Sequence, residues 1–353
     1  EPDLLAEVSR SPGQRGGHEA RKDEWGRLHG SGLRSTGRIV LNLWRLLRGE
    51  LRLARYSFEA CCFAVLRERA PEFTPKQLLA WWGDPAHRWR SVAHVAGRAE
   101  ANLRMMGALD VVGRTSEFAR VFGIDFESVL VRGSQYRVES LLVRLAHTQN
   151  YVLLSPSREQ VANQPAMEAL PLVMEPESRF YSSPVVVLDF QSLYPSVMMA
   201  YNICYSTFLG RFSSAVRGWP RRMGAKTEAP RQYPLTGGLH PDALHYLPNG
   251  AIFVKEEHRC GVLPRMLREV LATRQMAKRA MKEAGTSPAA RRALDSRQLG
   301  LKLLANVTYG YTSAGFSGRM PCAEVADAIV QAGRETLENA IRLIEQRKEW
   351  GAR

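Results

Sequence analysis

The sequence has few acidic residues, few cysteines and no long apolar run, and each shortage excludes a class of protein. Asp and Glu together number 35 against 49 Lys and Arg, which leaves a formal charge of +14. A surplus of that size favours a polyanionic partner, with nucleic acid first, over a neutral metabolite. No apolar run reaches the ~18 residues that a membrane-spanning helix needs, so we expect no membrane association.

The five cysteines contain no C-x-x-C pair, which argues against a zinc or iron–sulfur site. Their apolar surroundings predict buried free thiols in a reducing compartment. Hydrophobic residues make up 45% of the chain and charged residues 24%, as in ordinary globular proteins. A length of 353 residues predicts two or three domains.

Composition also divides the chain. Gly, Ser and Arg without periodicity predict a loop or weakly ordered arm over residues 1–36. Apolar residues at helical spacing predict helices within 39–53 and 85–109, in an α-rich region with short strands. Dense prolines predict a connector over 155–184, and a polar stretch rich in Arg, Gly and Pro predicts an irregular insertion over 211–250.

The second half has stronger helical patterns. Two long basic helices are expected over about 263–284 and 290–308, and residues 285–288 between them predict an αα-hairpin. A last amphipathic helix is expected over about 322–347. With a buried strand at 185–188, these elements predict a mixed α/β (α+β) fold.

Asp189 directly follows that apolar, β-branched run and precedes a predicted helix. Ligands commonly bind at the carboxyl end of such a strand, and hard cations such as Mg²⁺ prefer carboxylate oxygens. Asp189 is therefore a candidate metal ligand. A cap at the start of the following helix explains the residue equally well.

Two pairs of polar donors lie at i,i+4 spacing on the predicted hairpin, Arg274 with Lys278 and Lys302 with Asn306. Facing a common cleft, they would form a triphosphate clamp, which suits phosphoryl transfer. Lys302 lies in an otherwise apolar stretch, where a lysine costs desolvation unless an anion arrives. A solvated basic face explains most other cations of the first helix.

Two motifs carry a specific resemblance. Asp189-Phe190-Gln191-Ser192-Leu193-Tyr194-Pro195-Ser196 resembles the first palm motif of B-family DNA polymerases, and Lys302-x-x-x-Asn306-Val307-Thr308-Tyr309-Gly310 resembles their fingers motif. Residues 37–45, 132–140 and 311–322 resemble the zeta type of that family. The resemblance implies an inactive exonuclease-like domain over 37–154, the first part of the palm over 185–260, the fingers over 261–310 and the second part of the palm over 311–353.

The resemblance also implies roles for single residues. Asp189 would hold the catalytic Mg²⁺ ions, with the carbonyl of Phe190 as a further ligand, and Tyr194 would lie under the incoming sugar and exclude a 2′-hydroxyl. The four donors Arg274, Lys278, Lys302 and Asn306 would grip the triphosphate, and Tyr309 with Gly310 would line the pocket for the nascent base pair. From the residues alone, ordinary aromatic core remains open for both tyrosines.

Three departures from the family pattern qualify the activity. Asn42 stands where proofreading relatives carry an acid, and His94 and Arg98 stand roughly where they carry a Tyr-x-x-x-Asp metal pattern, so we expect no exonuclease activity. Val307 replaces a serine common in the family, which matches the zeta type and should leave the chemistry intact.

The third departure is the missing second palm motif. A Tyr-Gly-Asp-Thr-Asp-type hairpin, which bears the second metal-binding acid, does not occur in the chain, and two metals normally need more than one carboxylate. We therefore expect an incomplete polymerase that is inactive alone. Asp327 is a possible substitute, but its helical setting favours a surface or capping role.

The resemblance thus implies translesion-type, template-directed DNA synthesis without proofreading, in the nucleus. The expected partners are primer–template DNA, deoxynucleoside triphosphates and polymerase accessory subunits, the last docking mostly on segments outside this chain. Two alternatives stay open: a non-catalytic nucleic-acid-binding fragment, for which the +14 charge suffices, and a proofreading replicative polymerase.

Overall fold

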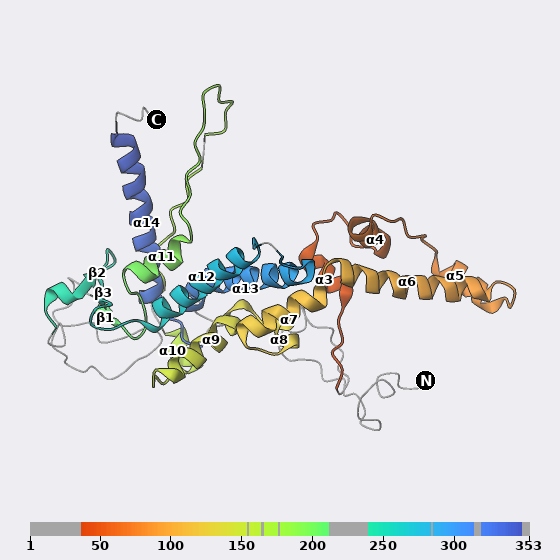
Figure 1. The fold of residues 1–353 in the computed structure, drawn as a ribbon, viewed down its shortest axis with the longest axis horizontal. Helices are drawn as coiled ribbons and strands as arrows, with labels where there is room; N and C mark the ends of the chain where they lie inside the picture. Colours follow the sequence, from red (N-terminus) through yellow and green to blue (C-terminus); the bar gives the residue numbers. More distant parts are fainter. Residues whose placement is uncertain are drawn as a thin grey trace. The chain divides into compact units, whose positions relative to one another are not determined.

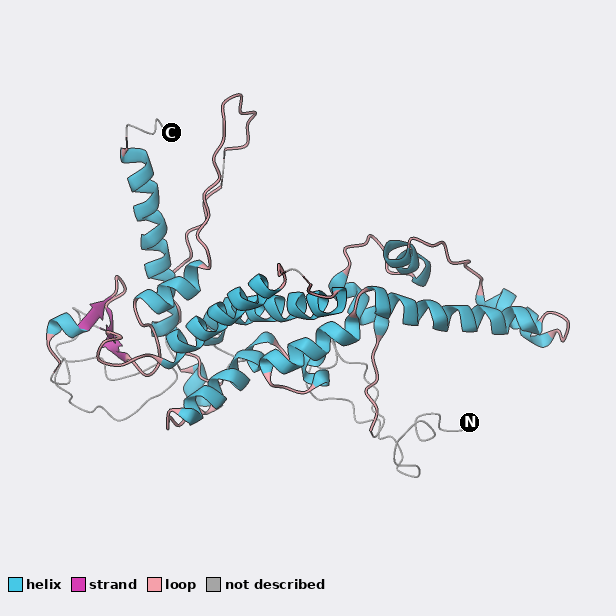
Figure 2. Ribbon diagram, in the orientation of Figure 1, coloured by secondary structure: helices cyan, strands magenta, loops and turns pink. Residues whose placement is uncertain are grey.

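The computed structural model describes residues 37–153, 155–163, 166–175, 177–211, 239–283, 285–313 and 319–347. The arm expected over residues 1–36 lies outside the described residues, as does most of the insertion expected over 211–250. The chain divides into two compact units, residues 1–120 with 124–133, and residues 121–123 with 134–353. Helices dominate the described parts of both (Figure 2).

The first unit is helical. Its elements are α3 (Leu43–Glu50), α4 (Phe58–Leu66), α5 (Pro75–Gly83), α6 (Arg88–Ala108), α7 (Val111–Phe122, whose last two residues belong to the second unit) and α8 (Phe126–Val131). The helices predicted within 39–53 and 85–109 are confirmed as α3 and α6. The described part of this unit contains no strand, so the short strands expected there are wrong. Buried Leu47, Cys61, Cys62 and Met105 form its core.

The second unit contains the predicted hairpin. Its helices are α9 (Ser134–Thr148), α10 (Arg158–Ala162), α11 (Leu193–Ala200), α12 (Val262–Ala280), α13 (Pro288–Ser313) and α14 (Ala323–Gln346), with a short 3₁₀ helix η1 (Pro241–Ala243). Helices α12 and α13 run side by side and are joined by a short connection (Figure 1). The hairpin and the last amphipathic helix are therefore confirmed as α12, α13 and α14.

A small antiparallel sheet completes this unit. The strands β1 (Phe208–Arg211), β2 (Leu244–Tyr246) and β3 (Ala251–Val254) lie in the order β1-β3-β2. Phe208 pairs with Phe253 and Gly210 with Ile252, and an irregularity between Phe208 and Gly210 shifts the register. Strand β3 is buried along its whole length because it lies between its two partners.

Residues 185–188 do not form the predicted buried strand. They belong to no helix or strand, and their side chains are between 62% and 87% exposed. A strand buried on both faces needs a hydrogen-bonded neighbour and apolar cover. Within the described residues, the three strands pair only with one another. The β-branched run therefore forms no strand in the described structure.

The expectation of buried free thiols is confirmed for four cysteines and is wrong for Cys260. All five cysteines are free, and four of them are buried, with Cys260 exposed. Among the described helices, none combines the length and the apolar character that crossing a bilayer requires.

Candidate active site

The palm motif and the fingers motif meet at a pair of aromatic rings. Tyr194 lies in the first turn of α11, and Tyr309 lies near the end of α13. Their rings are stacked, with centroids 4.7 Å apart and planes inclined by 30°. Both residues are half-buried, so neither is enclosed in the core.

The surroundings of Tyr309 keep its phenol neutral. Burial raises its pKa above the ordinary value, and the neighbouring Tyr194 and Asp327 raise it further. The next residue, Gly310, is half-buried, and a Cβ at this position would meet no atom within 4 Å. The two tyrosines and Gly310 thus form an uncharged platform with open space at one end.

The predicted donors line exposed stripes of the hairpin. Lys278, Lys302 and Asn306 are exposed, and Arg274 is half-buried. The Nε of Arg274 donates a hydrogen bond to Oε1 of Gln298, one helical turn before Lys302 on α13, at 3.4 Å. Arg274 and Lys302 therefore lie on adjoining parts of one face.

The desolvation expected for Lys302 is wrong. Helix α13 buries Leu301, Leu304, Ala305 and Thr308, and Lys302 lies on the opposite, exposed side of the same turns. A helix that packs on one side keeps every third or fourth residue in solvent, even in an apolar stretch. Lys302 is thus free to approach an anion without first leaving a buried position.

Pairing distinguishes the cations of α12. Arg265 forms an ion pair with Glu269 at 3.1 Å, and Arg268 forms one with Glu256. Within the described parts of the chain, no carboxylate forms an ion pair with Arg274, Lys278 or Lys302. The cations at the base of the hairpin are therefore neutralised, and these three keep their positive charge for a ligand.

Asp189 and Phe190 lie just before α11, in a segment that belongs to no helix or strand. Asp189 is exposed, and the Phe190 side chain is 39% exposed. A carboxylate and a backbone carbonyl are oxygen donors of the type that Mg²⁺ accepts. Among the described residues, however, no three His, Cys, Asp or Glu side chains gather as a metal site. The donors fit Mg²⁺ in kind and are too few to hold it by themselves.

Asp327 is not a surface residue. It is 3% exposed, and its carboxylate oxygens accept hydrogen bonds from the backbone N–H groups of Glu168, at 3.0 and 3.1 Å, and Ala169, at 3.0 Å. The expected surface or capping role is wrong, because Asp327 is buried and its carboxylate binds backbone amides of the connector, which belong to no helix. A carboxylate with these partners is unavailable as an open metal ligand.

Sequence reasoning missed Asn202, which joins the end of α11 to the start of α12. Its Nδ2 donates to the carbonyls of Val254 (2.8 Å) and Arg259 (2.7 Å), and its Oδ1 accepts from the N–H of Gly261 (2.9 Å). A Cβ on Gly261 would lie 2.9 Å from that oxygen and from the Cβ of Cys204, so only glycine fits. In the sequence, the local signal for this role is only that the polar Asn202 lies between apolar neighbours.

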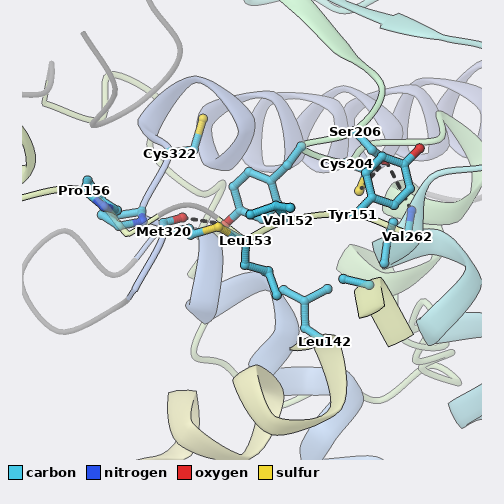
Figure 3. Close-up of a pocket in the computed structure, with 13 residues that line it drawn as sticks. Leu142, Tyr151, Val152, Leu153, Pro156, Cys204, Ser206, Val262, Met320 and Cys322 are labelled. Atoms are coloured by element: carbon cyan, nitrogen blue, oxygen red, sulfur yellow. Dashed lines mark hydrogen bonds between the residues drawn. The ribbon is translucent and has the colours of Figure 1, made fainter. Parts of the chain in front are cut away.

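A separate cavity of about 180 Å³ lies beside the start of α12 (Figure 3). Leu142 of α9, Val262 of α12 and Cys322 before α14 are among its lining residues. Burial raises the pKa of the Cys322 thiol well above its ordinary value, so the thiol is neutral. The lining is mainly apolar and suits neither a triphosphate nor a metal. We therefore treat this cavity as distinct in chemistry from the tyrosine platform.

In the first unit, Asn42 and Arg98 line one cavity of about 470 Å³. Asn42 also caps α3 by accepting a hydrogen bond from the N–H of Arg45 at 3.2 Å. The guanidinium of Arg98 lies 4.1 Å from the ring centre of Phe58. None of the described residues that line this cavity is a carboxylate, so it offers a cation and amides to a metal ion.

Comparison with known proteins agrees with the motifs. Residues 124–352 match DNA polymerase family B. The chain is 54% identical to the DNA polymerase zeta catalytic subunit of Arabidopsis thaliana over 94% of this chain and 17% of that protein. Identity to the zeta catalytic subunit of Homo sapiens is 48%, over 99% of this chain and 11% of that protein.

A more distant relative is the DNA polymerase delta catalytic subunit of Drosophila melanogaster, 33% identical over 89% of this chain and 27% of that protein. The resemblance predicted from the two motifs, including its zeta type, is confirmed. The chain spans between 11% and 27% of the lengths of these three relatives.

Proposed function

The chain belongs to DNA polymerase family B, and from that premise we propose that it forms part of a translesion-type, template-directed DNA polymerase. In this proposal residues 37–154 are the inactive exonuclease-like domain, 185–260 and 311–353 belong to the palm, and 261–310 are the fingers. The observation that carries it is the stacking of Tyr194, from the palm motif, on Tyr309, from the fingers motif.

The tyrosine platform would hold the nucleoside end of the incoming nucleotide. Tyr194 would lie under the deoxyribose and exclude a 2′-hydroxyl, and Tyr309 with Gly310 would face the nascent base pair. An uncharged aromatic surface accepts any of the four bases by stacking.

The hairpin would hold the triphosphate. Arg274, Lys278 and Lys302 have no carboxylate partner in the described part of the chain, so a triphosphate would be their first counterion. Positive side chains at this place neutralise the charge that develops on the leaving pyrophosphate. Asn306, on the same exposed stripe as Lys302, would donate a further hydrogen bond from its amide.

Asp189 and the carbonyl of Phe190 would contribute ligands to the catalytic Mg²⁺ ions. Bound metal ions in such sites stabilise the attacking and leaving oxygens of an in-line displacement. Since the described residues supply one suitably open carboxylate at this place, the proposal requires at least one more from another part of the polymerase.

Absence of proofreading is part of the proposal. Asn42, His94 and Arg98 supply no carboxylate where the family pattern has acids. Arg98 lines one cavity with Asn42 and a second with His94, Glu68 and Glu100, and it pairs with Glu59 at 3.6 Å. His94 packs edge-on against Phe73, with ring centres 5.2 Å apart, which gives it a structural role. Degradation of single-stranded DNA would contradict this part and favour a replicative relative.

The proposed partners follow from the same reading. Primer–template DNA and deoxynucleoside triphosphates are the substrates, accessory subunits dock mostly on segments outside this chain, and the place of action is the nucleus. A non-catalytic nucleic-acid-binding role is the second candidate, favoured by the +14 charge alone. Both candidates predict salt-sensitive DNA binding, so only nucleotide incorporation separates them.

The test is Mg²⁺-dependent primer extension by a chimaera, in which this chain replaces the matching segment of the zeta catalytic subunit of Saccharomyces cerevisiae, to which it is 44% identical. Asp189→Asn should lower kcat by about two to three orders of magnitude, as loss of one transition-state contact does. Asp242→Asn is the matched control, because the Asp242 side chain is 91% exposed on η1.

Equal rates for the parent chimaera and Asp189→Asn would contradict the proposed role of Asp189. A folded chimaera that binds DNA with normal affinity and incorporates no nucleotide would favour the binding role instead.

A further inference from the structure

Helix α14 comes unusually close to the ring of Tyr194. Gly333 is buried in α14, and a Cβ at this position would lie 3.1 Å from Cε1 and 3.4 Å from Cδ1 of Tyr194. Carbon atoms in ordinary contact stay about 3.5 to 4.0 Å apart. The missing side chain at residue 333 is therefore what allows the ring to rest against the helix.

The ring has little freedom to move away. It is stacked on Tyr309 at 4.7 Å between ring centres, and Tyr309 follows the fully buried Thr308 on α13. The backbone of Tyr194 is also fixed, because α11 packs against α12, α13 and α14 and buries Pro195 and Val197. A methyl group at residue 333 would have to displace the Tyr194 ring relative to Tyr309.

A Cβ on Gly113 of α7 would also crowd a side chain, that of Asp110, but among the glycines compared only Gly333 faces an aromatic ring. At Gly97 and Gly107, both inside α6, a Cβ would meet nothing within 4 Å. Glycine inside a helix is less favourable than alanine, so a glycine in the middle of α14 needs a reason of its own. The close approach of the Tyr194 ring supplies that reason.

We propose that Gly333 is the positioning residue for Tyr194, and that by omitting a side chain it sets how closely the nucleotide site discriminates against a ribose sugar. The inference rests on the proposed function, in which Tyr194 lies under the incoming sugar. Gly333 touches no substrate in this account and acts only through the placement of the ring.

The first test compares sugars in the primer-extension assay. In the chimaera, Gly333→Ala should lower the ratio of kcat/KM for a deoxynucleotide to kcat/KM for the matching ribonucleotide by about tenfold, which corresponds to about 1.4 kcal/mol. Gly97→Ala is the matched control and should leave the ratio unchanged. A loss of folded enzyme lowers both kcat/KM values equally, so a merely structural effect cannot move the ratio.

A second measurement uses the chain as it is and needs no activity. With ¹³C-labelled tyrosine, the ring resonances of Tyr194 and Tyr309 should shift in Gly333→Ala and stay in place in Gly97→Ala, because stacked rings shield each other. Unmoved resonances in Gly333→Ala would overturn the inference even if the chimaera were inactive.

Tyr194→Ala separates the two possible failures. If Tyr194→Ala lowers the sugar ratio and Gly333→Ala does not, the inference about Gly333 is wrong and the proposed function stands. If neither variant changes the ratio, Tyr194 does not read the sugar, and that part of the proposed function fails together with the inference.

Discussion

Tyr205, which is half-buried, and Tyr311, which is fully buried, are two phenols that differ in one hydrogen bond. The hydroxyl of Tyr205 donates to the carbonyl of Met320 at 2.7 Å. Tyr311 is 0% exposed, and within the described residues its hydroxyl has no hydrogen-bond partner. Burial raises the pKa of Tyr311 far above the ordinary value, because the charged form has no water around it. The two residues therefore allow a hydrogen-bonded hydroxyl to be compared with a buried one that has no partner among the described residues.

We expect opposite effects from removing these two hydroxyls. Tyr205→Phe should lower the free energy of unfolding by about 1 kcal/mol, since it loses a hydrogen bond and leaves a buried carbonyl unpaired. Tyr311→Phe should leave it unchanged or raise it by up to about 1 kcal/mol, since no bond is lost and a desolvated hydroxyl is removed. Urea denaturation of both variants checks this, and an equal loss in the two would refute the contrast.

The roles of some single residues could not be predicted from the sequence. The roles of Asn202 and Gly333 depend on contacts with segments distant in the chain, and a sequence read in order does not display such contacts. Asp327 was expected on a surface because its neighbours fit a helix, yet its partners, Glu168 and Ala169, come from the connector.

Among the helices and strands, those with a clear periodic sequence pattern were the ones that could be predicted. Apolar residues at helical spacing gave α12, α13 and α14, because a helix makes its backbone hydrogen bonds within its own segment. The run at 185–188 failed as a strand, because a strand needs partners that its own residues do not specify. The prediction that Lys302 is desolvated was wrong for a related reason. The helices that pack against α13 determine which of its sides is buried.

We expect the cations of the hairpin without a carboxylate partner among the described residues to contribute to nucleotide binding, and the paired ones to contribute little. In the chimaera, Arg274→Ala and Lys302→Ala should each raise KM for deoxynucleoside triphosphates by about tenfold or more, since a charged hydrogen bond contributes about 1.5 to 3 kcal/mol. Arg265→Ala is the control, because Glu269 already pairs with Arg265 at 3.1 Å. Steady-state incorporation kinetics give the values. A KM change for Arg265→Ala as large as for Arg274→Ala would contradict the clamp.

At the scale of the whole molecule, charge and motifs carry different information. The +14 charge predicted a polyanionic partner without saying what is done to it. The two motifs named the chemistry, and the structure brings their tyrosines into one stack. Only part of the proposed metal site could be predicted from the sequence. Asp189 is visible beside the predicted helix, whereas the further carboxylate that the proposal requires is not among the residues grouped as a metal site in the described part of the chain.

We propose that this chain carries one part of a polymerase site whose remaining carboxylate lies elsewhere. The most direct measurement is Mg²⁺-dependent extension of a labelled primer by the purified chain beside the chimaera, at equal concentrations and with DNA binding measured for both. We predict that both bind the primer–template and that only the chimaera extends it. Extension by the chain alone would contradict the claim, because a second catalytic carboxylate would then lie within these 353 residues.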